Sequence, residues 1–336
     1  MTKEEREFPS YRQLRQRSDA PPGSAWNLFG EGDQRGMLNN AGAEEVVLAA
    51  SLIRTGEVFG LDYPLNTFVP SPGGTRPGTK HNIFANHENH RDDWLDSFYL
   101  QSTSQIDGLR HIRHPEYGFF GGIADDRIDV GTPELGIQNI ADRGIVGRGV
   151  LLDVGRAFER IGRAFDISTN EMLSPADLDL VAELEGVTFR RGDVLIIRLG
   201  WVPFYLALPP KERPKGRGRS GNPGLQQSEA MLEWIWDHRF AMIAADNSGL
   251  EATPVDKTSG WFDFDAPPPL PLKPTHNGTL HRPLIALFGM PIGELWRLED
   301  LAASCAADGR YEFFVSAKPI NLVGGVGSPP NAMAIK

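Results

Sequence analysis

The chain has 336 residues, with 34 Lys and Arg against 44 Asp and Glu, which gives a formal net charge of −10. Hydrophobic residues make up 40% and charged residues 23%, proportions typical of a folded globular protein and not of a disordered one. The acidic balance argues against nucleic acid or an anionic membrane as the main partner, because both require a basic surface. The one cysteine, Cys305, excludes a disulfide within the chain and a zinc site built from several cysteines.

The N-terminal residues 1–25 are charged and polar, and we expect them to form a surface arm. They lack the apolar stretch of a secretory signal, and no apolar run in the chain is long enough to span a membrane, so the sequence predicts a cytoplasmic protein. With 37 Gly and 26 Pro the chain is rich in turns, which argues against an all-helical fold.

Apolar periodicity and capping residues predict helices and short buried strands along the chain, a pattern typical of α/β or α+β folds. In chain order the predicted elements are a helix at 41–54 capped by Asn40, a strand at 147–154, a helix from Ser174 to Gly186, a strand at 193–200, a helix at 225–239, a strand at 240–246, a helix at 295–307 and a final strand at 311–318. This order alone does not fix the topology.

Two segments between these elements are predicted to be long loops. Residues 209–224 are rich in Lys and Arg, and we expect a solvated insertion, with a phosphate or partner site as the alternative. Residues 253–278 are rich in proline and aromatic residues and include Pro267, Pro268 and Pro269 in a row. Proline cannot donate a ladder hydrogen bond, so this segment is not expected inside a sheet. A wall or lid over a pocket is one role that such a loop could have.

Common nucleotide-binding and hydrolase motifs are absent from the sequence. There is no GxxxxGK[ST] loop, no GxGxxG after a clear strand, no GxSxG elbow and no HExxH. The polar segment HENHRDD contains His87, His90, Asp92 and Asp93, and His81 precedes it. We expect a solvated loop there, with a helical metal-binding face formed by His87 and His90 as the alternative.

The segment QSTSQIDGLRHIRH, residues 101–114, has the highest density of side chains suited to catalysis or metal binding. Gln101, Gln105, Asp107 and His111 are separated by even numbers of residues, so in an extended chain they project from one face, and Gly108 permits a bend. Asp107 and His111 are suited to metal binding with the Gln oxygens as weaker donors, or to general acid–base chemistry. A polar strand edge bonded to the backbone is the third possibility.

This segment resembles the signature His-x-Gly-Thr-His-x-Asp-x-x-x-His of the cyclase family, which includes bacterial kynurenine formamidase and isatin hydrolase. The two early histidines fall on Gln101 and Gln105, and the later residues fall on Asp107 and His111. A branch of the family reads Gln-x-Asp-Gly-Leu-Arg-His, as this chain does. Further similar segments are 26–40, 55–65, 147–154, 192–201, 245–246, 279–281 and 289–295.

The resemblance implies an α/β fold of the swivelling β/β/α type, with a mixed sheet core and long loops. It implies that residues 26–336 form a single domain, and that the protein is a homodimer or homotetramer. It also implies a divalent metal, manganese or zinc. The implied metal ligands are Gln105, Asp107, His281 and Glu294. Carboxamide oxygen is a weaker donor than imidazole, so the two glutamines should lower the affinity for zinc.

The resemblance further implies the catalytic residues His111, Asp107 and Glu294. The residues expected to contact a small-molecule substrate are Gln101, Arg110, Phe119, Phe120 and Trp201. The implied function is a hydrolase or cyclase that acts on the carbonyl of a lactone, cyclic amide or aryl amide. Two alternatives stay open: a metal-free isomerase, dehydratase or cyclase that uses Asp107 and His111 for acid–base chemistry, and a non-catalytic small-molecule binder.

Overall fold

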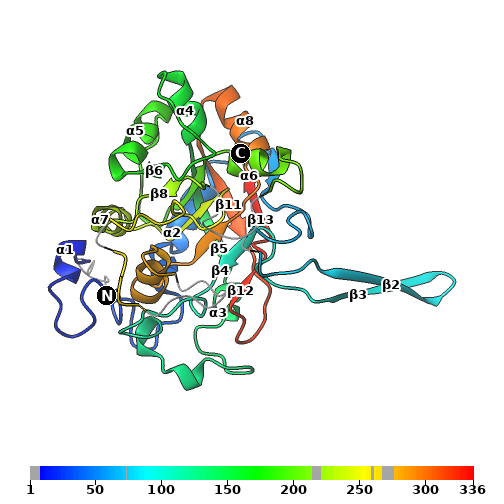
Figure 1. The fold of residues 1–336 in the computed structure, drawn as a ribbon, viewed down its shortest axis with the longest axis horizontal. Helices are drawn as coiled ribbons and strands as arrows, with labels where there is room; N and C mark the ends of the chain where they lie inside the picture. The colour runs from blue at the N-terminus through cyan, green and yellow to red at the C-terminus, as the bar shows by residue number, and fades with distance from the viewer. Residues whose placement is uncertain (1–7, 73, 214–220, 259–260, 267–275) are drawn as a thin grey trace.

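The computed structural model describes residues 8–72, 74–213, 221–258, 261–266 and 276–336. A mixed sheet of nine strands forms the centre of this part of the chain (Figure 1). In spatial order its strands are β1 (Val58–Gly60), β13 (Ala332–Ile335), β11 (Glu312–Ala317), β5 (Ile145–Asp153), β7 (Val194–Arg198), β9 (Met242–Ala245), β10 (Ile292–Glu294), β4 (Gln105–Asp107) and β12 (Gly327–Ser328).

The four middle strands, β5, β7, β9 and β10, run parallel, and antiparallel strands flank them on both sides. Strands β7 and β9 are almost wholly buried, which explains why they read as continuous apolar runs instead of alternating ones. The predicted strands at 147–154, 193–200 and 240–246 are therefore confirmed with small shifts of their ends. The strand predicted at 311–318 is β11, but it is not the final strand, because β12 and β13 follow it.

Eight α-helices and four 3₁₀- or π-helical segments surround this sheet in the described part of the chain. The α-helices are α1 (Tyr11–Leu14), α2 (Ala43–Ala50), α3 (Gln138–Ala141), α4 (Val154–Arg160), α5 (Pro175–Glu185), α6 (Trp201–Ala207), α7 (Glu229–Asp237) and α8 (Glu299–Asp308). The helical turns are η1 (Gly36–Asn40), η2 (Phe120–Gly122), η3 (Asp125–Arg127) and the π-helix η4 (Arg282–Leu287). Two further two-residue strands, β6 (Met172–Leu173) and β8 (Gly224–Leu225), pair in parallel.

The helix ends show which capping predictions were right. Ser174 accepts a hydrogen bond from the Asp177 backbone N, and Gly186 ends α5 in the left-handed conformation, as predicted. The predicted cap Asn40 was wrong. Asn40 lies in η1, and α2 begins after Gly42, whose backbone N donates to the Glu45 carboxylate at 2.8 Å.

Strands β2 (Lys80–His87) and β3 (His90–Asp96) form a separate two-stranded hairpin that projects far from the rest of the molecule (Figure 1). The loop predicted for HENHRDD was therefore wrong, and so was the helical metal face. His87 and His90 pair across the turn of this hairpin, and the chain there is extended. The alternation of apolar and polar residues on this hairpin is weak, which hid it from a reading of periodicity.

The N-terminal arm is partly integrated into the core, because Tyr11 and Leu14 are buried and α1 lies against α7. The boundary at residue 25 stays a prediction. The centre of the basic loop 209–224 and much of the predicted lid 253–278, including Pro267 to Pro269, lie outside the described residues. No helix in the described part of the chain is both long and apolar enough to cross a membrane.

Candidate metal centre

Two carboxylates of the site are brought together by the pairing of β4 with β10. These strands are antiparallel, with Gln105 opposite Glu294 and Asp107 opposite Ile292. Side chains on one face of a strand recur at every second residue, so Gln105, Asp107 and Glu294 all project from the same face. Both strands are fully buried, and the two acidic side chains are withdrawn from solvent.

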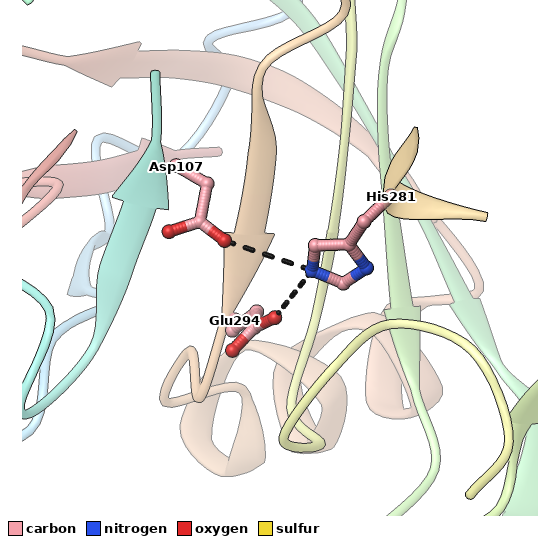
Figure 2. A group of neighbouring side chains, drawn as sticks. All are labelled: Asp107, His281 and Glu294. Carbon is pink, nitrogen blue, oxygen red and sulfur yellow. Dashed lines mark hydrogen bonds and ion pairs between the residues drawn. The ribbon is translucent and has the colours of Figure 1, made fainter. Parts of the chain in front are cut away.

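The third group, His281, comes from the residue that precedes the π-helix η4. Its imidazole is fully buried and points between the two carboxylates (Figure 2). His281 Nε2 lies 3.0 Å from Glu294 Oε1 and 3.6 Å from Asp107 Oδ2. One ligand atom from each of the three residues lies within 4.8 Å of the others. The structure thus brings together residues that are more than 170 positions apart in the chain.

Glu251 completes this cluster from the other side of the imidazole and was missed by the sequence analysis. Its two carboxylate oxygens lie 2.8 and 2.9 Å from His281 Nδ1. Glu251 is buried and follows the parallel strand β9, in the segment that starts at Asp246. Ligands of α/β sheets gather at the carboxyl ends of parallel strands, so that rule was the signal that pointed to this segment.

The charges of the cluster shape its titration. Burial disfavours the charged form of Asp107, but His111, His281 and Arg76 outweigh it and lower the pKa of this carboxyl below its ordinary value. Burial likewise opposes the charged form of His281, but Glu251, Asp107 and Glu294 raise the pKa of the imidazole well above its ordinary value. Three buried carboxylates around one imidazole leave excess negative charge that favours a bound cation.

A divalent ion fits the donor set of this cluster. Asp107 Oδ2 is buried and accepts no hydrogen bond from the described residues, which leaves an acceptor with unused capacity at the centre of the cluster. Two carboxylates and one imidazole are typical ligands of a catalytic metal, which keeps at least one coordination position open. In many metalloproteins a carboxylate outside the metal's ligand shell accepts a hydrogen bond from a metal-binding histidine and orients its ring. Glu251 has this position relative to His281 Nδ1.

The two glutamines at the positions of the family's early histidines donate hydrogen bonds to the carboxylates of the cluster. Gln101 Nε2 donates to Asp107 Oδ1, and Gln105 Nε2 donates to Glu294 Oε2 at 2.8 Å. The Gln105 oxygen faces Arg76 Nη1 at 3.4 Å. The structure therefore places Gln105 beside the candidate ligands with its amide nitrogen toward Glu294, an arrangement different from the metal ligation that the resemblance implied.

His111 lies at the more open side of the cluster, with 14% of its side chain exposed. Its Nε2 lies 3.6 Å from Asp107 Oδ2, and its Nδ1 lies 3.2 Å from Gln101 Nε2. Only 105–107 of the expected extended segment form a strand. Gln101 lies in a preceding turn and His111 follows the bend at Gly108, and this bent path brings both side chains to Asp107.

A turn near the C-terminus fixes the position of Gln101. Gly327 on β12 pairs with Asp107, and a Cβ atom at this glycine would lie 2.8 Å from Gln101 Cγ and 2.7 Å from the Ile106 carbonyl oxygen. Only glycine permits this close approach.

Arg110, expected to bind a substrate carboxylate, is buried and points into neighbouring loops. A guanidinium has five N–H donors. Here they meet the backbone carbonyl oxygens of Glu134, Asp129, Gly324, Arg127 and Thr132. No donor is left over for a substrate, and this geometry makes Arg110 a residue that orders loops.

The aromatic residues expected to contact substrate lie in the hydrophobic core. Phe119, Phe120 and Trp201 are all at most 9% exposed. Trp201 stacks on Tyr205 with ring centroids 5.0 Å apart. These positions describe packing, and a contact of these rings with substrate stays a prediction.

The fold and this cluster define a class: a mixed α/β domain with a buried site of carboxylates and histidine suited to a metal. The Cyclase family model matches residues 61–252, and a crystal structure described as a novel cyclase is 31% identical, with 93% of this chain and 99% of that chain covered and a TM-score of 0.77. The chain therefore belongs to the cyclase family.

Isatin hydrolase A from Labrenzia aggregata, in a structure with bound benzyl benzoate, shares the fold. It is 14% identical, with 85% of this chain and 95% of that chain covered and a TM-score of 0.54. A comparison with curated proteins gave no match. The family and the fold expected from the motif at 101–111 are thus confirmed.

Proposed function

We propose that the protein is a metal-assisted hydrolase or cyclase that opens or closes a lactone, cyclic amide or aryl amide. The observation that carries this proposal is the convergence of Asp107, His281 and Glu294 in one buried cluster with excess negative charge. Membership of the cyclase family supports it. The charge of −10 over the whole chain suits a small-molecule substrate better than a nucleic acid.

Asp107, His281 and Glu294 would hold the ion, and Glu251 would keep the imidazole oriented with Nε2 toward it. When bound, a divalent ion polarises a carbonyl oxygen and lowers the pKa of water. Carboxylates favour manganese, whereas imidazole and thiolate favour zinc. With two carboxylates to one histidine, we propose manganese as the better match and zinc as the alternative.

His111 would move the proton of the reaction. Its imidazole is more exposed than the buried ligands and lies 3.6 Å from Asp107, so it can exchange protons with a substrate held at the cluster. Gln101 bridges Asp107 and His111 and would fix the orientation of the ring. In ring opening, His111 would accept a proton from the attacking water and return it to the leaving oxygen or nitrogen.

A metal-free mechanism is the second candidate. The chain of contacts from Gln101 to Asp107 and His111 is complete within the protein, and an ionised Asp107 beside His111 is an acid–base pair. This candidate predicts an isomerase, a dehydratase or a ring-closing cyclase that keeps its activity in chelator.

The test is a panel of lactones, cyclic amides and aryl amides assayed after chelation and after addition of Mn²⁺ or Zn²⁺. The proposal predicts turnover that is lost on chelation, restored by metal and lost in Asp107→Asn. Turnover that persists in chelator favours the metal-free candidate. Tight binding of panel members without turnover, at saturating metal, favours a binding protein.

A further inference from the structure

Arg76 is a cation beside the candidate metal centre that the proposed function does not use. Its side chain is half-buried. Its Nη1 atom donates to the backbone carbonyl oxygen of Gln101 and faces the side-chain oxygen of Gln105 at 3.4 Å. These two glutamines donate in turn to Asp107 and Glu294. A single glutamine therefore separates the guanidinium from each of the two carboxylates.

These contacts occupy only one of the three nitrogen atoms of the guanidinium. In the described part of the chain, Arg76 Nε and Nη2 donate to no acceptor, and neither atom is enclosed by protein. The N–H groups of Nε and Nη2 lie parallel along one edge of the guanidinium, and such a pair can bind both oxygens of a carboxylate. Arg76 thus has an anchored nitrogen and an accessible edge suited to a carboxylate.

The loop that carries Arg76 is fixed before any ligand binds. Asn66 Nδ2 donates to the Thr79 carbonyl oxygen at 2.8 Å, and the Thr79 backbone N donates to Asn66 Oδ1 at 2.8 Å. Within this loop the Ser71 backbone N donates to the Arg76 carbonyl oxygen at 3.3 Å, and Pro77 disfavours a helical backbone at Arg76. A guanidinium held in this way loses less conformational entropy when it binds a carboxylate.

The two arginines next to His111 in the chain are already engaged elsewhere. Arg110 donates to five backbone carbonyl oxygens of neighbouring loops. Arg113 Nε lies 3.2 Å from Asp125 Oδ1. Arg76, which contacts the glutamines of the cluster, is therefore better placed to bind a substrate carboxylate than Arg110, to which the sequence analysis assigned that role.

The charge of Arg76 also makes the centre compatible with an anion. A metal-bound histidine is neutral, so the carboxylates of Asp107, Glu251 and Glu294 with one divalent ion would have a net charge of −1. The guanidinium of Arg76 brings this sum to zero. Its field reaches the cluster, because Arg76 is one of the groups that lower the pKa of Asp107. An anionic substrate would then meet no net repulsion at the centre.

We propose that Arg76 determines substrate specificity by binding a carboxylate that the substrate carries in addition to its reacting carbonyl. This inference rests on the proposed function and narrows its substrate class to lactones, cyclic amides or aryl amides with an acidic substituent. The substituent binds side-on to Arg76 Nε and Nη2. The reacting carbonyl is then held on the side of Gln101 where Asp107 and His111 lie.

The first experiment measures binding to the metal-free protein, because a bound metal would itself attract an anion. Benzoate and its uncharged counterpart benzamide are titrated by ligand-observed NMR into the wild type, Arg76→Gln and Arg76→Lys. Arg160→Gln is the matched control, because Arg160 Nη1 also donates to a backbone carbonyl oxygen, that of Leu184 at 3.3 Å, and Arg160 lies in α4. Thermal unfolding verifies the fold of each variant.

The wild type and Arg160→Gln should bind benzoate more tightly than benzamide. Arg76→Gln should raise the dissociation constant of benzoate by about tenfold to a hundredfold, because a charged hydrogen-bond donor is lost. Arg76→Lys keeps the charge but loses the pair of parallel donors, so its loss should be intermediate. Absence of benzoate binding to the wild type, or equal binding to the wild type and folded Arg76→Gln, would overturn the proposal.

The second experiment compares kcat/KM, in the metal-loaded protein, for pairs of panel compounds that differ only by a carboxylate. The wild type should prefer the carboxylated member, and Arg76→Gln should reduce this preference by about tenfold to a hundredfold. An arginine with a merely structural role would lower both members equally, and an unchanged preference would overturn the proposal. If no compound is turned over but benzoate binding still depends on Arg76, the proposed function fails and the assignment of Arg76 as a carboxylate-binding residue stands.

Discussion

Replacement of Glu251 tests whether a buried carboxylate behind the imidazole tunes the candidate metal centre. Glu251 accepts a hydrogen bond from His281 Nδ1 at 2.8 Å, which holds the ring with Nε2 toward Asp107 and Glu294. Glu251→Ala removes a charged hydrogen bond worth about 1.5–3 kcal/mol. Loss of an outer-shell partner of this kind lowers metal affinity by about 10–100-fold. Glu251→Gln keeps an acceptor without the charge, so we expect a smaller loss, on the order of tenfold.

The assay is calorimetric titration of the metal-free protein with Mn²⁺ at constant pH. Glu185→Gln is the matched control, because Glu185 is another buried glutamate that accepts hydrogen bonds, there from the Asp153 backbone N. It should leave Mn²⁺ affinity unchanged. Thermal unfolding of each metal-free variant verifies that the fold is intact. If Glu251→Ala is folded and binds Mn²⁺ as tightly as the wild type, the orienting role of Glu251 is refuted.

Two more substitutions, together with Glu185→Gln, separately test proton transfer, side-chain positioning and stability. His111→Gln should keep the Mn²⁺ affinity of the wild type and lower the turnover number by about 10²–10⁴-fold, measured on the best substrate of the panel. If the variant also loses its affinity for Mn²⁺, His111 is a metal ligand instead. Gly327→Ala should displace Gln101 and lower activity, because the added Cβ would lie 2.8 Å from Gln101 Cγ. Unchanged activity, with Gln101 unmoved in a crystal structure of the variant, would contradict this prediction. Burial raises the pKa of Glu185 from 4.5 to about 8, so the folded state keeps a proton that the unfolded state releases, and stability should fall as pH rises through this window. Denaturant unfolding between pH 5 and 8 should show a shallower fall in Glu185→Gln, and an identical pH dependence would refute that assignment.

The parallel core of the fold was predictable from the sequence because local signals were strong there. Strands β7 and β9 are continuous apolar runs, and α5 carries a serine cap, a proline at its first position and a terminal glycine. Short elements were missed because two or three residues carry no periodicity. Strand β12 consists of Gly327 and Ser328, and its place in the sheet depends on tertiary pairing with β4.

The candidate site was predictable in its members but not in their roles. Family resemblance pointed to Asp107, His281 and Glu294, which the structure brings together. Glu251 was missed because it lies 30 positions from His281 in the chain, and no local sequence motif indicates that the two residues are in contact. Arg110 shows the converse, since a sequence cannot tell a guanidinium that faces a pocket from one surrounded by backbone carbonyls.

The most direct test of the metal centre is anomalous diffraction at the manganese absorption edge from crystals grown with Mn²⁺. The account predicts one strong anomalous peak among Asp107 Oδ2, His281 Nε2 and the Glu294 carboxylate, and no such peak in Asp107→Asn crystals grown in the same way. A map without a peak there at saturating Mn²⁺, together with full activity in chelator, would contradict the account.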